Sequence, residues 1–383
     1  MKTIIIIPTY NEKENIGNLI EELEQVFTKI PSEFEMSILI VDDSSPDGTG
    51  EIVQTKARKY SNIYLFTNKE KKGLGAAYSR GIKYAIDKLE ADLVFEYDAD
   101  GSHQPKYIPG MLSEISKGAD VVVGSRYVPG GSMPKDWGLD RKIISYFGNF
   151  IARLVFFTFQ YRDITSGFRL TKTKFLKQID LDNLLSKQYA YKIHHFYALH
   201  KLGAKIKEYP IDFIDRAQGK SKFPKNNIQD SLRVVFTLRW RESQKFIKVC
   251  LVGGIGAVIQ FSLFNSLRLK ISPEYANTIA VEIAVISNFI INNTWTFKEE
   301  KIKFSQIGKL IVKFLQFNLV SLGSIFIQFL VMKIGISTLR RSFLLENAFV
   351  AVGILIGLLW NYTMYTKLIW KKAKNAKKID AKT

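Results

Sequence analysis

The sequence predicts an α/β domain followed by a helical membrane region. Apolar β-branched runs alternate with helix-like spacing over the first half of the 383 residues. Long uncharged apolar segments fill the last third, and nearly all of the excess positive charge lies in the second half. The first pattern is typical of a parallel sheet covered by helices, and the second is typical of membrane spans.

In the first half, predicted strands and helices follow one another in turn. Strands are expected at 2–8, 36–42, 62–67, 92–97 and 120–125, and helices at 14–27 and 75–89. This alternation predicts an open parallel sheet that binds ligands at the carboxyl ends of its strands. Five residues fall at those ends, namely Pro8, Asp42, Asp43, Asp98 and Asp100.

The segment VFEYDADGSH, residues 94–103, places two carboxylates just after a predicted strand. Asp98 and Asp100 are two residues apart and therefore point to the same side, with the small Ala99 between them. Two hard carboxylates suit Mg²⁺ or Mn²⁺ that carries a substrate diphosphate. The alternative is a solvated, aspartate-rich turn.

The charge is unevenly distributed along the chain. Of 55 Lys and Arg and 36 Asp and Glu, residues 216–383 hold 26 and 8, while the first 215 residues are close to neutral. A basic region of this kind suggests nucleic acid or an anionic membrane surface. Because the basic residues surround long apolar segments, we predict a lipid bilayer and no nucleic acid as the partner.

Four membrane spans are predicted, at about 246–268, 274–297, 310–333 and 344–367. The alternative is a set of buried helices in a soluble protein. Glu282 is the single charge of residues 275–297 in the second span, and we expect it near the span end as a snorkelling or helix-packing residue.

Basic residues predict the orientation of these spans. Lysines follow the second and fourth spans. This placement predicts that both lysine-rich segments and the α/β domain lie on the cytoplasmic side of a multi-pass protein in the cell membrane. The first strand is too short for the apolar part of a signal peptide, and the single Cys250 excludes an intrachain disulfide.

Five ordered motifs resemble those of family 2 glycosyltransferases, and among these the dolichol-phosphate mannose synthases. They are Pro8–Glu12 (PTYNE), Val41–Thr49 (VDDSSPDGT), Lys72–Gly75 (KGLG), Asp98–Asp100 (DAD) and Gly124–Tyr127 (GSRY). Asn292–Phe297 (NNTWTF) resembles the GtrA-like four-helix membrane domain that is fused to some of these synthases.

The resemblance implies a GT-A (Rossmann-like) glycosyltransferase domain, interfacial helices and four transmembrane helices. Its expected boundaries are 1–225 for the cytoplasmic GT-A domain, with an interfacial helix at about 141–160, then 226–245 for a second interfacial helix or linker. The membrane domain follows at 246–370 and a basic cytoplasmic tail at 371–383. The apolar stripe of the 141–160 segment also fits a core helix of the first domain.

The resemblance also implies residue roles on the donor side. The nucleotide-sugar pocket is expected to contain Pro8, Tyr10, Glu12, Val41, Asp43, Asp98, Ala99, Asp100, Lys192, Arg216 and Lys222. Asp100 is the expected metal ligand, with Asp98 beside it. Relatives often place a second ligand two residues after the aspartate that corresponds to Asp100, and here that residue is Ser102, a weaker ligand, followed by His103.

On the acceptor side, Arg126, Arg141 and Ser132 are expected to hold the phosphate of the lipid. Asp100, Arg126 and Arg216 are the expected catalytic residues, and residues 163–169 (DITSGFR) match a family signature whose task is loop ordering or acceptor contact. A phosphate monoester is largely dianionic near neutral pH, so the reaction does not require a strong general base.

The expected function is inverting transfer of mannose from GDP-mannose to dolichyl or polyprenyl phosphate, with Mg²⁺ or Mn²⁺, for glycan assembly. One alternative donor is UDP-glucose. A different alternative is a lipid-linked sugar transporter or scaffold whose first domain only binds nucleotide. The sequence leaves open a homo-oligomer formed through the membrane domain.

Overall fold

The computed structural model describes residues 1–214, 226–303, 305–338 and 343–371. The chain divides into two compact units, with the boundary between Arg239 and Trp240. The first unit is the α/β domain, and the second is entirely helical within its described residues. This organisation agrees with the fold class that the sequence predicts.

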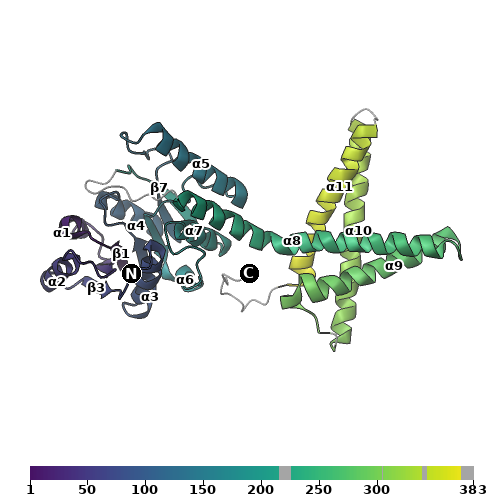
Figure 1. The fold of residues 1–383 in the computed structure, drawn as a ribbon, viewed down its shortest axis with the longest axis horizontal. Coiled ribbons are helices and arrows are strands. Elements are labelled where there is room, and N and C mark those ends of the chain that lie inside the picture. Colours follow the sequence, from purple (N-terminus) through teal and green to yellow (C-terminus); the bar gives the residue numbers. More distant parts are fainter. Residues whose placement is uncertain (215–225, 304, 339–342, 372–383) are drawn as a thin grey trace. The chain divides into compact units, whose positions relative to one another are not determined.

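The α/β unit is built on a seven-stranded sheet with the strand order β3-β2-β1-β4-β6-β5-β7 (Figure 1). The strands are β1 (Lys2–Thr9), β2 (Glu35–Asp42), β3 (Ile63–Thr67), β4 (Leu93–Glu96), β5 (Val121–Ser125), β6 (Arg169–Lys172) and β7 (Ile206–Pro210). The helices are α1 (Lys13–Phe27), α2 (Thr49–Lys59), α3 (Leu74–Asp87), the 3₁₀ turn η1 (Pro105–Tyr107), α4 (Ile108–Ser116), α5 (Leu139–Phe156), α6 (Thr173–Leu176) and α7 (Tyr191–Lys201).

Strands β1 to β4 are parallel, as predicted, and the continuous apolar runs of β1, β2 and β4 are buried on both faces of the sheet. The expectation of a wholly parallel sheet is wrong, because β6 pairs antiparallel with both β4 and β5. The sequence analysis missed β6 and β7, which are four and five residues long and carry polar residues among their apolar ones.

Alternate residues of β4 and of the turn after it face opposite sides of the sheet. Phe95 and Tyr97 enter the core that contains α1 and α4, while Glu96 and Asp98 face the side covered by α3 and α7. This alternation brings both carboxylates under the same two helices.

Helix α5 carries a narrow buried strip and a wide exposed apolar face. Ala152 and Phe156 are buried, and the Phe156 ring stacks on Tyr197 at 4.1 Å. The exposed face, which we call the α5 apolar face, consists of Leu139, Ile143, Ile144, Tyr146, Phe147, Phe150 and Leu154, continued by Phe157 and Phe159. This exposure fits the predicted interfacial helix better than the alternative of a core helix.

The predicted division between a second interfacial helix and the first span is not seen. A single helix, α8 (Asn226–Leu267), covers both segments. Within the first unit, Val235 and Leu238 of α8 are buried in the core, whereas Phe236 is 55% exposed. The first turns of α8 therefore pack on the α/β domain with one face and leave the other face apolar and exposed.

The second unit continues with α9 (Pro273–Ile291), the π-helical turn η2 (Asn292–Thr296), the 3₁₀ turn η3 (Lys298–Glu300), α10 (Ile307–Thr338), α11 (Phe343–Met364) and the π-helical turn η4 (Tyr365–Ile369). Helices α10 and α11 lie side by side (Figure 1). Among the described residues, three helical segments are long and apolar enough to cross a membrane, in α8, in α10 and at 351–369. The second of the four expected spans, which corresponds to α9, is not one of them.

The NNTWTF segment forms a buried junction in the second unit. The Asn293 side chain donates to the carbonyl of Ile302 and accepts its N–H, and Trp370 Nε1 also donates to Asn293. The Phe297 and Trp370 rings stack at 4.5 Å. This segment therefore joins the end of α9 to the chain before α10 and to the end of η4.

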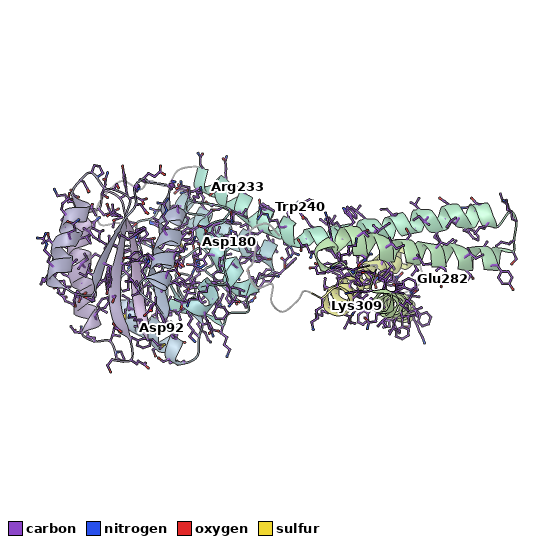
Figure 2. The ribbon with its side chains drawn as sticks, turned by 90° about the horizontal axis from the view of Figure 1, so that it is seen from below. Asp92, Asp180, Arg233, Trp240, Glu282 and Lys309 are labelled. Carbon is purple, nitrogen blue, oxygen red and sulfur yellow. The ribbon has the colours of Figure 1, made fainter. Side chains whose placement is uncertain are left out.

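Glu282 differs from its expected position near a helix end. It lies in the middle of α9, and its side chain is exposed (Figure 2).

Candidate active site

The predicted donor residues gather at the carboxyl ends of β1, β2 and β4. Asp42 orders the loop after β2, because its oxygens accept hydrogen bonds from the Thr9 hydroxyl and from the backbone and hydroxyl of Ser45. Asp43 instead accepts a hydrogen bond from the Asn68 side chain at 2.6 Å. Burial raises the pKa of Asp43, opposed by the Asn68 hydrogen bond and the positive charges of Arg80 and Lys71.

The PTYNE segment lines the same end of the sheet. The Lys71 ammonium lies 3.5 Å from the centre of the Tyr10 ring, an arrangement in which the cation meets the ring face. The Glu12 backbone N–H donates to Thr49, and the Glu12 carboxylate accepts from Asn15 in the first turn of α1. Glu12 therefore ties the end of β1 to both neighbouring helices.

Asp98 is held by two donors from different elements. Tyr78 of α3 donates to Oδ1 at 2.8 Å, and the Lys192 ammonium of α7 donates to Oδ2 at 3.0 Å. Burial alone would raise the pKa of Asp98, but Lys192, His103 and the Tyr78 hydroxyl together hold it well below its usual range. Asp98 is therefore ionised at neutral pH.

Asp100 and Ser102 form the turn that follows. The Ser102 N–H donates to Asp100 Oδ1 at 3.1 Å, and Gly101 between them has a φ of +77°, a conformation that glycine adopts readily. Asp100 is half-buried, whereas Ser102 is 3% exposed. Of these two predicted ligands, Asp100 is therefore more exposed to solvent than Ser102.

His103 is a buried histidine that fixes the backbone of the acidic turn. Its Nδ1 accepts the Asp98 N–H at 3.1 Å, and its ring stacks on Phe168 at 5.0 Å. Burial lowers the pKa of His103 to about 4. The ring is neutral at pH 7, and the proton is on Nε2 because Nδ1 accepts.

Arg126 forms a buried bidentate ion pair with Asp163. Its Nε and Nη2 lie 2.7 and 2.9 Å from the two carboxylate oxygens, and Nη2 also donates to Thr165. Arg126 is 8% exposed and Asp163 is fully buried. Although burial opposes both charges, the pair raises the pKa of Arg126 and lowers that of Asp163.

The other two predicted acceptor residues are engaged within the protein. The Ser132 hydroxyl donates to Asp212 at 2.7 Å, and the Tyr107 hydroxyl donates to the other oxygen of that carboxylate at 3.0 Å. The Arg141 guanidinium lies 3.9 Å from the centre of the Trp137 ring. The Phe213 ring lies between Trp137 and Arg126, so both arginines border one aromatic cluster.

The remaining predicted donor residues differ in position. The Val41 side chain is fully buried in the core, so only its backbone could reach a nucleotide, and Ala99 is also buried. Pro8 is half-buried near the end of β1. Arg216 and Lys222 lie outside the described residues.

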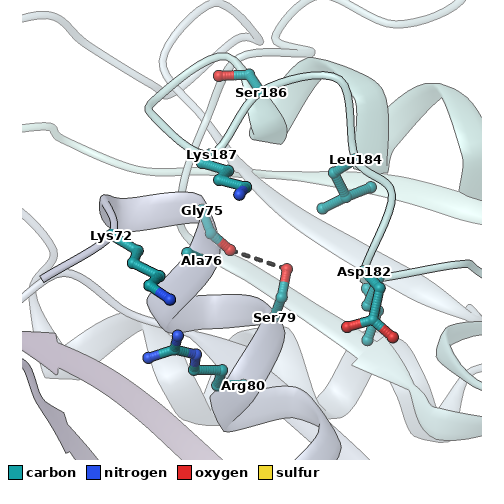
Figure 3. A pocket seen from close by; sticks show the side chains of 10 residues that line it. Lys72, Gly75, Ala76, Ser79, Arg80, Asp182, Leu184, Ser186 and Lys187 are labelled. Carbon is teal, nitrogen blue, oxygen red and sulfur yellow. Dashed lines mark hydrogen bonds between the residues drawn. The ribbon is translucent and has the colours of Figure 1, made fainter. Parts of the chain in front are cut away.

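A cavity of about 200 Å³ lies beside the first turns of α3 (Figure 3). Its lining includes Lys72, Gly75 and Arg80 of the KGLG segment and α3, facing Asp182 and Lys187. The N–H groups of Gly75 and Ala76 both donate to the carbonyl of Lys187. This start of a helix is therefore already bonded to protein, as in a turn that leads into a helix.

Several residues at the site were missed by the sequence analysis. Asn68 follows the carboxyl end of β3 and pairs with Asp43, and the strand-end rule would have identified it. Tyr78 is a helix residue with no such signal. Asp163 was noticed as part of a motif, but the sequence could not show that it binds Arg126.

The arrangement suits a divalent cation that shares its ligands with a diphosphate. Within the described ranges, no group of three or more His, Cys, Asp or Glu side chains is placed to hold a metal ion. Both oxygens of Asp98 accept hydrogen bonds from the protein, whereas the Asp100 carboxylate is half-buried in the turn that follows. One carboxylate together with substrate phosphates is an ordinary ligand set for Mg²⁺.

Known proteins match both units of the chain. Residues 4–180 match the model of the glycosyl transferase family 2, and residues 248–370 match that of the GtrA/DPMS transmembrane domain. A dolichol-phosphate mannosyltransferase of Pyrococcus furiosus is 31% identical over 374 residues, which are 97% of this chain and 99% of that protein.

Two bacterial relatives match the first unit. An undecaprenyl-phosphate mannosyltransferase of Micrococcus luteus is 37% identical over 63% of this chain and 94% of its own length. A polyprenol monophosphomannose synthase of Mycolicibacterium smegmatis is 35% identical over 60% of this chain and 84% of its own. The chain therefore belongs to glycosyl transferase family 2, as a glycosyltransferase with a fused membrane domain of the GtrA/DPMS type.

Proposed function

We propose that this glycosyltransferase moves mannose from GDP-mannose to a dolichyl or polyprenyl phosphate, with inversion at the sugar carbon. The observation that carries this proposal is the similarity to the Pyrococcus mannosyltransferase, which extends through both units of the chain. The names of the two bacterial relatives, an undecaprenyl-phosphate mannosyltransferase and a polyprenol monophosphomannose synthase, support the same class of acceptor.

The donor side of the site supports binding of a nucleoside diphosphate. Asp43 and Tyr10 lie at adjacent strand ends, where a nucleoside binds in sheets of this kind. Asp100 is placed to hold Mg²⁺ or Mn²⁺ against the diphosphate, and such an ion stabilises charge on the leaving group. Lys192 lies beside Asp98 and brings a positive charge to the same place.

The acceptor side must bring a second phosphate near the first. A phosphate monoester is mostly dianionic at neutral pH, since its second pKa is about 6, and can attack without a general base. Two such groups repel each other strongly unless cations lie between them. Arg126 and Arg141 border one aromatic cluster, and we assign the acceptor phosphate to these two cations, although the charge of Arg126 is already shared with Asp163.

The α5 apolar face supports delivery of a lipid acceptor. It exposes several large apolar side chains on one helix, a larger set than soluble proteins usually leave open to water. An amphipathic helix of this type lies in a membrane interface. The lysines that flank the membrane helices favour the cytoplasmic side of the cell membrane for the α/β domain.

The test uses the full chain in detergent with GDP-mannose, Mg²⁺ or Mn²⁺ and a polyprenyl phosphate. We expect a lipid-linked mannose, its loss on chelation, and its loss in Asp100→Ala with an unchanged thermal midpoint. Asp87→Ala, an exposed change at the other end of α3, is the matched control. Product from UDP-glucose instead of GDP-mannose would correct the donor.

The transporter alternative gives a different result in the same experiment. A lipid-linked sugar transporter would form no product from any nucleotide sugar, and its transport would be insensitive to Asp100→Ala. The absence of lipid-linked sugar with every common nucleotide sugar would refute the proposed function.

A further inference from the structure

The DITSGFR segment, residues 163–169, contacts both buried cations of the site. Its first half binds Arg126, through the Asp163 carboxylate and the Thr165 hydroxyl. Its second half surrounds Lys192, the partner of Asp98. Because Arg126 follows β5 and Lys192 begins α7, the segment connects two cations that come from distant parts of the sequence.

The contact with Lys192 depends on Gly167. A Cβ built on Gly167 would lie 2.8 Å from Lys192 Cε, still closer to the ammonium nitrogen, and 3.2 Å from Asp98 Oδ2. Real Cβ atoms are essentially never closer than 3.0 Å to such neighbours. The ammonium therefore occupies the space that any side chain at residue 167 would need.

Arg169 holds the backbone on both sides of this contact. Its Nη2 donates to the carbonyl of Ser166 at 3.1 Å and to that of Lys192 at 3.2 Å. Arg169 is itself fully buried, 3.8 Å from Glu96. One guanidinium thus links the glycine turn to the first turn of α7, from which the Lys192 side chain extends.

We propose that residues 163–169 are the positioning element for the two cations, and that Gly167 is a glycine so that the Lys192 ammonium can reach Asp98. This inference rests on the role of Lys192 in the proposed function. Gly167 does not touch the substrate in this proposal. It acts through Lys192, as Asp163 acts through Arg126.

Gly167→Ala separates this role from a structural one. The backbone of Gly167 is not in the left-handed region, so alanine can adopt its conformation, and the atoms that it meets are the end of a flexible side chain. We expect a folded protein in which the ammonium has moved away from Asp98. Transferase activity should fall about 10- to 100-fold, since deletion of one such donor costs on the order of 100-fold.

A double-mutant cycle with Lys192→Ala provides the decisive readout. Lys192→Ala should lose about 100-fold. In that background Gly167→Ala should change activity by less than about twofold, because the group that it displaces is gone. Gly17→Ala in α1, whose Cβ would make an ordinary contact of 3.6 Å with Ile52, is the matched control and should keep full activity.

The outcomes distinguish the two proposals. Full activity of Gly167→Ala, or losses that multiply in the double variant, would overturn the positioning role. If Gly167→Ala lowers the thermal midpoint strongly, Lys192→Ala must restore it, and failure to do so would also overturn that role. Unchanged activity of Lys192→Ala would instead refute the part of Lys192 in the proposed function.

Discussion

Replacing Glu96 by Gln should destabilise the α/β domain, at a position that does not contact the substrate. Glu96 is 1% exposed on β4, and its Oε2 accepts the Tyr191 hydroxyl at 2.7 Å. Its Oε1 lies 3.0 Å from His195 Nδ1 and 3.8 Å from Arg169 Nη1. Glutamine keeps the length of the side chain and removes its charge, which leaves Arg169 buried without its carboxylate.

The pKa of Glu96 gives the size of the effect. Burial alone would raise it, but His195, Arg169 and the hydrogen bond from Tyr191 lower it from 4.5 to about 2. The difference corresponds to about 3 kcal/mol of stability at neutral pH. Breaking a buried ion pair by removal of one partner costs about 3–5 kcal/mol, which agrees.

The same shift predicts a pH dependence with a definite sign. Because the pKa is lower in the folded state, the stabilisation is complete above pH 4.5 and is lost as the pH falls towards about 2. The free-energy difference between wild type and Glu96→Gln should therefore be largest near pH 7 and should shrink below pH 4.5. Groups that do not interact with Glu96 cancel in this difference.

The assay is urea unfolding of the full chain in detergent at several pH values, combined with hydrogen exchange of the β4 amides. Faster exchange of residues 93–96 in Glu96→Gln would assign the loss to the α/β domain. Equal stability of the two proteins at pH 7, or a difference that does not decrease at low pH, would refute the assigned electrostatics. Glu51→Gln, a change at an exposed residue of α2, is the control.

Three further predictions follow from the same structure. Asp163→Asn should lower stability by about 3–5 kcal/mol in thermal or urea unfolding, because Arg126 is left buried and unpaired, and Arg126→Gln in the same chain should recover part of the loss. A double variant with Phe147→Ser and Phe150→Ser changes two side chains that are 54% and 42% exposed. It should leave the thermal midpoint unchanged and raise the KM for a lipid acceptor in liposomes. An unchanged KM would contradict the interfacial placement of α5. Asp212→Ala should speed hydrogen exchange of the backbone amides at 128–134, because it removes the hydrogen bond from Ser132 to Asp212. The free energy of unfolding should change little, because the hydrogen bonds of Asp212 to Ser132 and Tyr107 are exposed. Unaltered exchange would show that Asp212 does not tether the 128–134 loop.

The sequence was informative wherever a pattern reports on local geometry. The apolar runs identified β1 to β5, and the strand-end rule placed Pro8, Asp43 and Asp98 in one region. The uncharged segments likewise marked the helices of the second unit. These features depend on a few neighbouring residues, so one sequence is enough to recognise them.

Features that depend on contacts between distant residues could not be read in this way. Arg126 was expected to bind the acceptor phosphate, but its pairing with Asp163 joins β5 to a segment nearly forty residues later (|i−j| = 37). Ser132, which was expected at the same phosphate, donates to Asp212, eighty residues away. Strand β6 escaped notice because its few residues mix polar and apolar types, so that only its neighbours make it a strand.

The two aspartates of the acidic turn therefore divide their tasks. Asp98 is neutralised by Lys192 and bonded to Tyr78, so it serves as a fixed, ionised anchor for α3 and α7. We propose that Asp100 is the carboxylate of the pair that holds the metal ion, and a single carboxylate binds Mg²⁺ weakly because this ion keeps its water. We therefore expect the ion and the donor diphosphate to bind together, each raising the affinity for the other by the same factor. On this account Asp98, Lys192 and the DITSGFR segment form a rigid frame of paired charges, and the negative charge of the donor completes the metal site.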